Sequence, residues 1–135
     1  MTKLGVITSL PTGQAMQGQE HKGIDIANVK GTPLPAFKGG TVVRSENGHQ
    51  QGEQNGGNVV WVRDDKGNVH QYNHLNRAIV RPGQRVADGQ QIGEMGNSGN
   101  AVSKSGMGDG VHLDYRITNA YRKYKNPLTY IKKYL

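Results

Sequence analysis

The stretch GVHLDYRI, residues 110–117, alternates apolar and polar side chains along most of its length. A period of two predicts a β-strand with one face buried and the other exposed. The apolar members are Val111, Leu113, Tyr115 and Ile117. The opposite face then carries His112, Asp114 and Arg116, so an imidazole and a carboxylate project together from one strand. This combination makes the strand a candidate site for chemistry.

Two other short segments place histidine and acidic side chains in the same way. His21 and Asp25 share one face of a predicted strand. His70, Tyr72 and His74 share one face of another. We therefore expect three strands to offer four histidines and two aspartates to a single cleft.

Composition indicates one domain built mainly of short strands. The chain has 135 residues, enough for a single core, and 20 of them are glycine, about twice the usual share of roughly 7%. Frequent glycine suits tight turns between short strands. No cysteine is present, which excludes disulfides, thiolate metal sites and cysteine nucleophiles. The expected fold is mainly β, a small antiparallel β-sandwich with an open groove.

Positive charge is concentrated at the C-terminal end. The chain up to Asp114 holds 11 Lys/Arg and 10 Asp/Glu, whereas the residues after it include six basic and no acidic side chains. The six are Arg116, Arg122, Lys123, Lys125, Lys132 and Lys133. Such a segment, with four tyrosines among its charges, suits a polyanion or a membrane surface, or is a solvated tail whose tyrosines cover the core.

The order of the remaining segments supports a small sandwich or barrel. Residues 1–20 are polar and Gly-rich and are expected to form a lead-in without regular structure, followed by a domain over 21–135. Strands are expected near 41–44, 58–63 and 69–75, with short strands after residue 80. The segments 45–57 and 97–109 are expected as loops, and His49 as a loop residue. Pro127 permits at most a short helix over 128–134.

Histidine and aspartate without cysteine point to a first-row metal bound by nitrogen and oxygen. A catalytic zinc needs three protein ligands and an open position for water, with further groups nearby to move protons. The residue types at these strands meet both needs.

Five segments in order and spacing resemble the LytM/lysostaphin-type zinc endopeptidases of family M23, which cut peptide bonds of bacterial peptidoglycan. Residues 21–25 match the family's H-x-G-x-D, 31–42 its G-T-P-x-x-A-x-x-x-G-x-V, and 57–75 its G-N-x-V…Y-x-H-L. Residues 80–99 match V-x-x-G-x-x-V…G-x-x-I-G…G-x-S/T-G. The last segment departs, because the family's H-L-H-[FY] reads His112-Leu113-Asp114-Tyr115 here.

The resemblance implies the family's β-sandwich of the duplicated hybrid motif type, with a groove walled by the loops 45–57 and 97–109. It implies one Zn²⁺ ion held by His21, Asp25 and Asp114, with Asp114 in the place of a histidine. It also implies that His74 and His112 act on the metal-bound water as base or as donors to the developing oxyanion. Tyr72 is expected to line the substrate groove.

Two functions remain open at this point. The first is a zinc-dependent endopeptidase of peptidoglycan. The second is a metal-impaired, non-catalytic relative that binds the cell wall or activates other hydrolases, because a second carboxylate at position 114 weakens the pull of the metal on its water. A lipoyl- or biotinyl-type carrier would need a lysine at the hairpin tip over residues 93–96, and none is present.

The expected partner is bacterial peptidoglycan, together with anionic wall polymers bound through the basic C-terminal segment. We expect no nucleic-acid partner and no membrane insertion, since no apolar run approaches 18 residues. The first residues do not resemble a signal peptide. A protein acting outside the membrane would then be a module of a larger secreted protein, or of a phage tail or lysin. The pattern gives no indication of oligomeric state.

Overall fold

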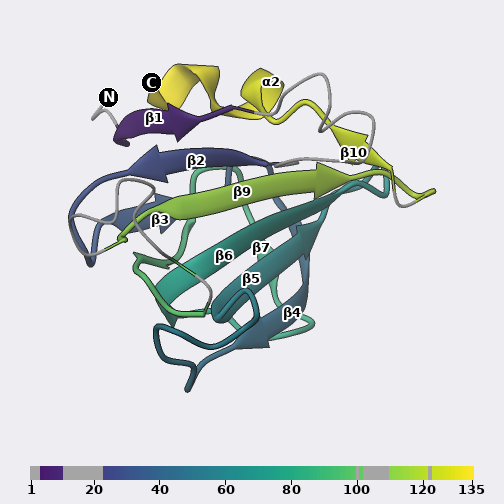
Figure 1. The fold of residues 1–135 in the computed structure, drawn as a ribbon. Coiled ribbons are helices and arrows are strands. Elements are labelled where there is room, and N and C mark those ends of the chain that lie inside the picture. Colours follow the sequence, from purple (N-terminus) through teal and green to yellow (C-terminus); the bar gives the residue numbers. More distant parts are fainter. Residues whose placement is uncertain (1–3, 11–22, 100, 102–109, 122) are drawn as a thin grey trace.

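The computed structural model describes residues 4–10, 23–99, 101, 110–121 and 123–135. Within them, ten strands form one antiparallel sheet that branches and curves, and a short helical segment follows near the C-terminus (Figure 1). The strands are β1 (Val6–Ser9), β2 (Ile24–Ala27), β3 (Pro33–Pro35), β4 (Gly40–Glu46), β5 (Asn58–Arg63), β6 (Val69–Ala78), β7 (Arg85–Val86), β8 (Gln91–Met95), β9 (Leu113–Thr118) and β10 (Tyr124–Lys125). The helical segment consists of α2 (Leu128–Ile131) and the 3₁₀ turn η1 (Lys132–Tyr134).

The longest path through the sheet runs β1-β2-β9-β6-β5-β4-β7. Strand β6 has ten residues and pairs with β5, β9 and β8, so the sheet divides along its length. Strand β3, which carries two prolines, pairs only with β8, as expected for residues that lack a backbone donor. The mainly antiparallel β class with a short C-terminal helix is confirmed.

The core lies beneath the face of β9 that the alternation marked as apolar. Leu113, Tyr115 and Ile117 have no exposed surface. The ring of Phe37 packs against Tyr115 with centroids 4.7 Å apart and against Tyr72 at 5.4 Å. Because these side chains fill one side of β9, its polar side chains are directed to the other.

The N-terminal segment contains a strand that the sequence analysis did not anticipate. Val6 and Ile7 pair with Ala27 and Ile26, which extends the sheet by β1. Leu4, just before the strand, is 5% exposed and belongs to the core. The expectation that residues 1–20 lack regular structure is therefore wrong for Val6–Ser9. Backbone pairing with β2 and burial of neighbouring apolar groups outweigh the polar composition around them.

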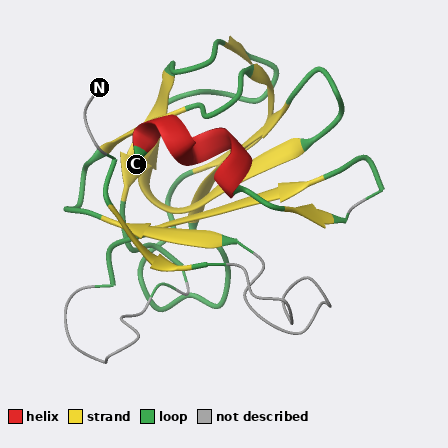
Figure 2. Ribbon diagram, turned by 90° about the horizontal axis from the view of Figure 1, so that it is seen from above, coloured by secondary structure: helices red, strands yellow, loops and turns green. Residues whose placement is uncertain are grey.

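The first and last described segments of the chain lie next to each other beside β2 (Figure 1). The Leu4 amide donates to the Tyr134 carbonyl at 2.8 Å. The helix follows Pro127 as expected, and its Ile131 is fully buried. Seen from above, the helical segment lies across the strands (Figure 2). None of the described helices is long and apolar enough to span a membrane.

Candidate functional site

A hollow of 530 Å³ opens along the polar face of the central strands. Asp25 on β2 and Asn73 on β6 are both register partners of Asp114 on β9. Register partners in an antiparallel sheet direct their side chains to the same face. The three side chains therefore form a row across the floor of the hollow, and His74 and His112 complete its lining at this end. His21 lies outside the described residues.

The two imidazoles stand side by side with ring centroids 5.0 Å apart. The Nδ1 atom of His74 lies 2.8 Å from the Ser98 carbonyl oxygen, and that of His112 lies 2.8 Å from the Gly110 carbonyl oxygen. A carbonyl only accepts, so each Nδ1 carries the proton, and a neutral ring presents a lone pair at Nε2. Burial lowers the pKa of His74, although the Ser98 carbonyl and the charge of Asp114 raise it. The neutral form of His74 is thus favoured.

Both Nε2 atoms face carboxylates at distances too long for a hydrogen bond. His74 Nε2 lies 3.8 Å from Asp114 Oδ2, and His112 Nε2 lies 3.9 Å from Asp25 Oδ1. A lone pair directed toward a carboxylate oxygen meets another acceptor. Such an arrangement is stabilised by a species with positive charge or donatable protons between the two, such as a cation or a water molecule.

A backbone irregularity on β6 directs His74 into the hollow. Its φ of 66° is the only positive value at a non-glycine residue in the described part of the chain. The His74 amide donates to the Gly56 carbonyl at 2.7 Å, outside the strand ladder. The left-handed conformation, which costs about 1–2 kcal/mol, breaks the alternation of side chains at this point. Asn73 and His74 therefore both line the hollow.

The same irregularity explains why His70 and Tyr72 do not reach the hollow. Both are fully buried on the core side of β6. His70 contacts Asp64 Oδ2 at 2.8 Å through Nε2 and the Tyr115 hydroxyl at 2.7 Å through Nδ1. The Tyr72 hydroxyl accepts a hydrogen bond from the Phe37 amide at 2.9 Å. The expectations that His70 joins the cleft and that Tyr72 lines the substrate groove are corrected.

Asp114 makes an ion pair that the sequence analysis did not foresee. Arg116 Nε donates to both carboxylate oxygens of Asp114, at 3.0 and 3.1 Å, and its Nη2 donates to Oδ2 at 2.8 Å. Hydrogen bonds from Arg116 to Asp114 raise the pKa of Arg116, whereas burial alone would lower it. The two residues stand two apart on one strand and so share a face. This spacing could have predicted the ion pair from the sequence.

Gly23 leaves the space that this ion pair occupies. A Cβ atom at position 23 would lie 2.5 Å from Asp114 Oδ1 and 2.6 Å from Arg116 Cγ. Such distances are far inside van der Waals contact. Any larger residue would therefore displace the pair or the strand.

The side chains in the hollow are of types that bind metal ions, but those that the structure describes do not form a complete metal site. Asp25 and Asp114 supply oxygen ligands of the kind zinc accepts, beside two imidazoles. Among the residues that the structure describes, no three histidine, aspartate or glutamate side chains lie close enough together to hold an ion. The expected set would require His21. Asp114 would bind the metal through lone pairs that its contacts with Arg116 leave open, or would give up part of those contacts.

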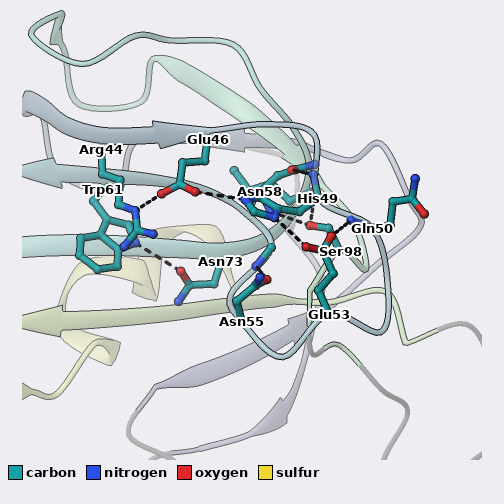
Figure 3. Close-up of polar contacts among 12 residues, drawn as sticks. Arg44, Glu46, His49, Gln50, Glu53, Asn55, Asn58, Trp61, Asn73 and Ser98 are labelled. Carbon is teal, nitrogen blue, oxygen red and sulfur yellow. Dashed lines mark hydrogen bonds and ion pairs between the residues drawn. The ribbon is translucent and has the colours of Figure 1, made fainter.

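The far end of the hollow carries a second polar group (Figure 3). The Arg44 guanidinium lies over the Trp61 ring at 4.6 Å from the centroid and pairs with Glu46. The Trp61 indole donates to Asn73 at 3.3 Å. His49 is a loop residue as expected, and it also lines the hollow, 3.1 Å from Glu46. The alternation within β5 could have placed Trp61 on the polar face, opposite Val60 and Val62.

Of the two expected walls, the first loop, residues 45–57, lines the hollow in part. Its lining residues are Glu46, His49, Gln54, Asn55, Gly56 and Gly57. Most of the second loop, residues 100 and 102–109, lies outside the described part of the chain.

The sequence profile of Peptidase family M23 matches residues 19–127, which include every candidate ligand and the three histidines of the hollow, His49, His74 and His112. The chain belongs to peptidase family M23. The family membership suggested by the sequence motifs is thereby confirmed.

Two relatives and one solved structure show the range of similarity. The chain is 36% identical over 119 residues to a lipoprotein NlpD/LppB homolog of Pseudomonas aeruginosa, covering 88% of the chain and 36% of that protein. It is 32% identical over 118 residues to the peptidoglycan DD-endopeptidase ShyC of Vibrio cholerae, covering 87% of the chain and 24% of that protein. The structure of LytU superposes with a TM-score of 0.72 at 29% identity, covering 96% of the chain and 86% of that structure. The chain thus spans about a third or less of the two longer relatives.

Proposed function

We propose that this chain is a zinc-dependent endopeptidase that cleaves peptide bonds of bacterial peptidoglycan. The observation that carries the proposal is the pair of imidazoles, each with Nδ1 held by a backbone carbonyl and Nε2 directed at a carboxylate across the same hollow. The similarity to a peptidoglycan DD-endopeptidase supports the substrate class.

The roles follow from the positions of the atoms. His74 and His112 each present an Nε2 lone pair that accepts a proton from an attacking water molecule. In the protonated form, the same atom donates to the oxyanion that develops on the scissile carbonyl. The hydrogen bonds to the Ser98 and Gly110 carbonyls hold both rings in this orientation and fix the tautomer.

His21, Asp25 and Asp114 would hold the zinc ion. When bound, it would polarise the scissile carbonyl and lower the pKa of water. The row of Asp25 and Asp114 across β2 and β9 supports two of these assignments. His21 is assigned from the family motif alone.

The test measures metal content and cleavage side by side. Purified protein is loaded with Zn²⁺, dialysed and analysed for zinc, and its action on purified peptidoglycan is followed by mass spectrometry of released muropeptides. We expect about one ion per chain and new peptide ends. Asp25→Ala is expected to lose the metal. His74→Ala and His112→Ala are expected to keep it and lose about 10²- to 10⁴-fold in cleavage rate.

Loss of zinc in the His74→Ala or His112→Ala variants would show that our assignment of ligands is wrong. Asn73→Ala serves as a control, because Asn73 lines the same hollow but has no assigned role in binding the ion or moving protons. Zinc binding without cleavage in the parent protein would reject the endopeptidase.

A second candidate function is a non-catalytic module that binds the wall or activates other hydrolases. The observation that favours it is the ion pair of Asp114 with Arg116, which occupies both oxygens of a proposed ligand. This candidate predicts binding to peptidoglycan with neither zinc nor cleavage. Whichever function holds, we place it at the bacterial cell wall, as part of a larger secreted or phage-borne protein.

A further inference from the structure

A second hollow, of 420 Å³, shares no lining residue with the groove described above. Four lysines from three separate segments surround it. Lys38 follows β3, Lys66 lies in the turn between β5 and β6, and Lys132 and Lys133 belong to η1. Phe37, Tyr130 and Thr129 complete most of the lining. The fold thus gathers cationic side chains that are far apart in sequence around a partly aromatic depression.

The single acidic residue of the lining, Asp64, supplies one negative charge against the four lysines, and both of its carboxylate oxygens are hydrogen-bonded within the fold. Asp64 Oδ1 accepts hydrogen bonds from the backbone amides of Lys66 and Asn68, at 2.9 and 3.0 Å. Asp64 Oδ2 contacts His70 Nε2 at 2.8 Å, and the Asp64 side chain is 2% exposed. The carboxylate therefore stabilises the turn between β5 and β6 through these hydrogen bonds.

The lysines have few partners of their own. Lys38 lies 3.8 Å from Asp88, which does not line the hollow and which also accepts a hydrogen bond from the Gly39 amide. Lys133 lies over the Tyr134 ring at 5.3 Å. Within the described residues, Lys66, Lys132 and Lys133 make no ion pair within 4.0 Å. Four lysines against the two carboxylates of Asp64 and Asp88 leave a net positive charge around the hollow, and an anionic ligand relieves the remaining repulsion.

We propose that this lysine hollow, lined by Lys38, Lys66, Lys132 and Lys133, binds the phosphate groups of a phosphodiester polymer of the cell wall. Several ammonium groups around one depression suit a ligand with closely spaced negative charges. Thr129 and Tyr130 also line the hollow, and their hydroxyl groups and the Tyr130 ring offer contacts to the polyol between phosphates. The site would anchor the protein beside peptidoglycan independently of the proposed catalysis.

The location refines the expectation that the whole basic C-terminal segment binds wall polymers. Tyr130 and Tyr134 pack against the core, with Tyr130 4.9 Å from the His70 ring and Tyr134 5.1 Å from Phe37. These contacts hold η1 in place, so the ammonium groups of Lys132 and Lys133 are presented by a supported element. Lys123 and Lys125 do not line the hollow.

The test is calorimetric titration of the intact chain with purified poly(glycerol phosphate), at two salt concentrations. The double variant Lys132→Gln, Lys133→Gln and the single variant Lys66→Gln are expected to weaken binding at least 10-fold and 3-fold, and to flatten its salt dependence. The control Lys30→Gln, Lys123→Gln removes the same charge from exposed positions outside the hollow. It is expected to weaken binding less than 2-fold.

Four results would overturn the proposal. The first three are no binding of the polymer, equal weakening by the control and the hollow variants, and equal affinity for polyglutamate, which carries carboxylates in place of phosphates. Tighter binding to phosphatidylglycerol vesicles than to the polymer would also overturn it, in favour of a membrane. The zinc and cleavage measurements on the same variants are expected to match the parent, so this test fails or succeeds separately from the proposed function.

Discussion

The carboxylate of Asp114 has two competing uses. It is a register partner of Asp25, so two carboxylates lie side by side on adjacent strands. Like charges in that position repel, and Arg116 offsets the repulsion through a bidentate contact with Asp114. In the resemblance to the M23 motif, a histidine stands at this position and would require no such counter-ion. Arg116 therefore offsets the charge of Asp114 in the absence of metal, and its contacts compete with a metal for the same two oxygens.

Removing Arg116 is expected to raise zinc affinity. In Arg116→Gln the carboxylate of Asp114 is released and the local charge becomes more negative, so the dissociation constant for Zn²⁺ should fall at least 10-fold in a chelator competition assay. The matched control is Arg44→Gln, which removes an arginine paired with an acid at the far end of the same hollow. An equal change in both variants would indicate a general charge effect. An unchanged affinity in Arg116→Gln would show that Arg116 does not compete with the metal for Asp114.

Substitution of Asp114 itself also tests whether this residue is a zinc ligand. Asp114→Asn should lower zinc affinity sharply, because a neutral amide oxygen is a poor ligand for zinc and the site loses a negative charge. Asp114→His restores the family motif and should bind at least as tightly as the parent. Equal zinc content of the parent and Asp114→Asn, measured after dialysis, would place the ion on other residues.

At the scale of elements, β6 connects the core to the hollow. Its first half directs His70 and Tyr72 inward, and its left-handed residue then redirects His74 to the other side. The irregular backbone is held by Ser98, whose hydroxyl donates to the Leu75 carbonyl at 2.5 Å and accepts from the Asn58 amide at 2.9 Å. One serine thus links three segments around the proposed catalytic histidine.

Ser98→Ala is expected to destabilise the protein by about 1–3 kcal/mol, because it leaves a buried amide and a buried carbonyl without their partner. Urea denaturation measures the change in the free energy of unfolding. Ser45→Ala is a suitable control, since its hydroxyl makes one bond, to the Val80 carbonyl, at a partly buried site. A Ser98→Ala variant no less stable than Ser45→Ala would contradict this role.

At the scale of the whole molecule, the regular alternation of apolar and polar residues predicted the structure well. Where the backbone is irregular, the prediction failed. The apolar face of β9, the positions of β4, β5 and β6 and the common face of Asp25 and Asp114 follow from a period of two, whereas β1 does not. The burial of Tyr72 could not be predicted, because it depends on where the alternation breaks, and a positive φ at His74 has no sequence signature. The pairing of Arg116 with Asp114 and the face of Trp61 could have been predicted from their spacing. The lysine hollow required the fold, since its members come from distant segments.

Stability at mildly acidic pH should depend on His70, whose ring is buried between Asp64 and Tyr115. Burial lowers the pKa of His70 below its ordinary value of 6.5, although the hydrogen bond to Asp64 raises it. The unfolded chain therefore binds a proton more readily than the folded protein does. Stability is then fully present above pH 6.5 and is lost as the pH falls below it, by at most about 1.4 kcal/mol per pH unit for one such group.

His70→Gln should accordingly flatten the fall in the free energy of unfolding between about pH 7 and pH 5, measured by urea denaturation, while lowering stability overall. Part of the fall should remain, because burial also lowers the pKa of His74. His49→Gln is the informative control, since the hydrogen bonds that the His49 ring donates to Glu53 and Glu46 raise its pKa, so its effect on stability has the opposite sign. Removing His49 should leave the acid-side fall intact or steepen it. A fall as steep in His70→Gln as in the parent would mean that the buried imidazole takes up its proton without opposing the fold.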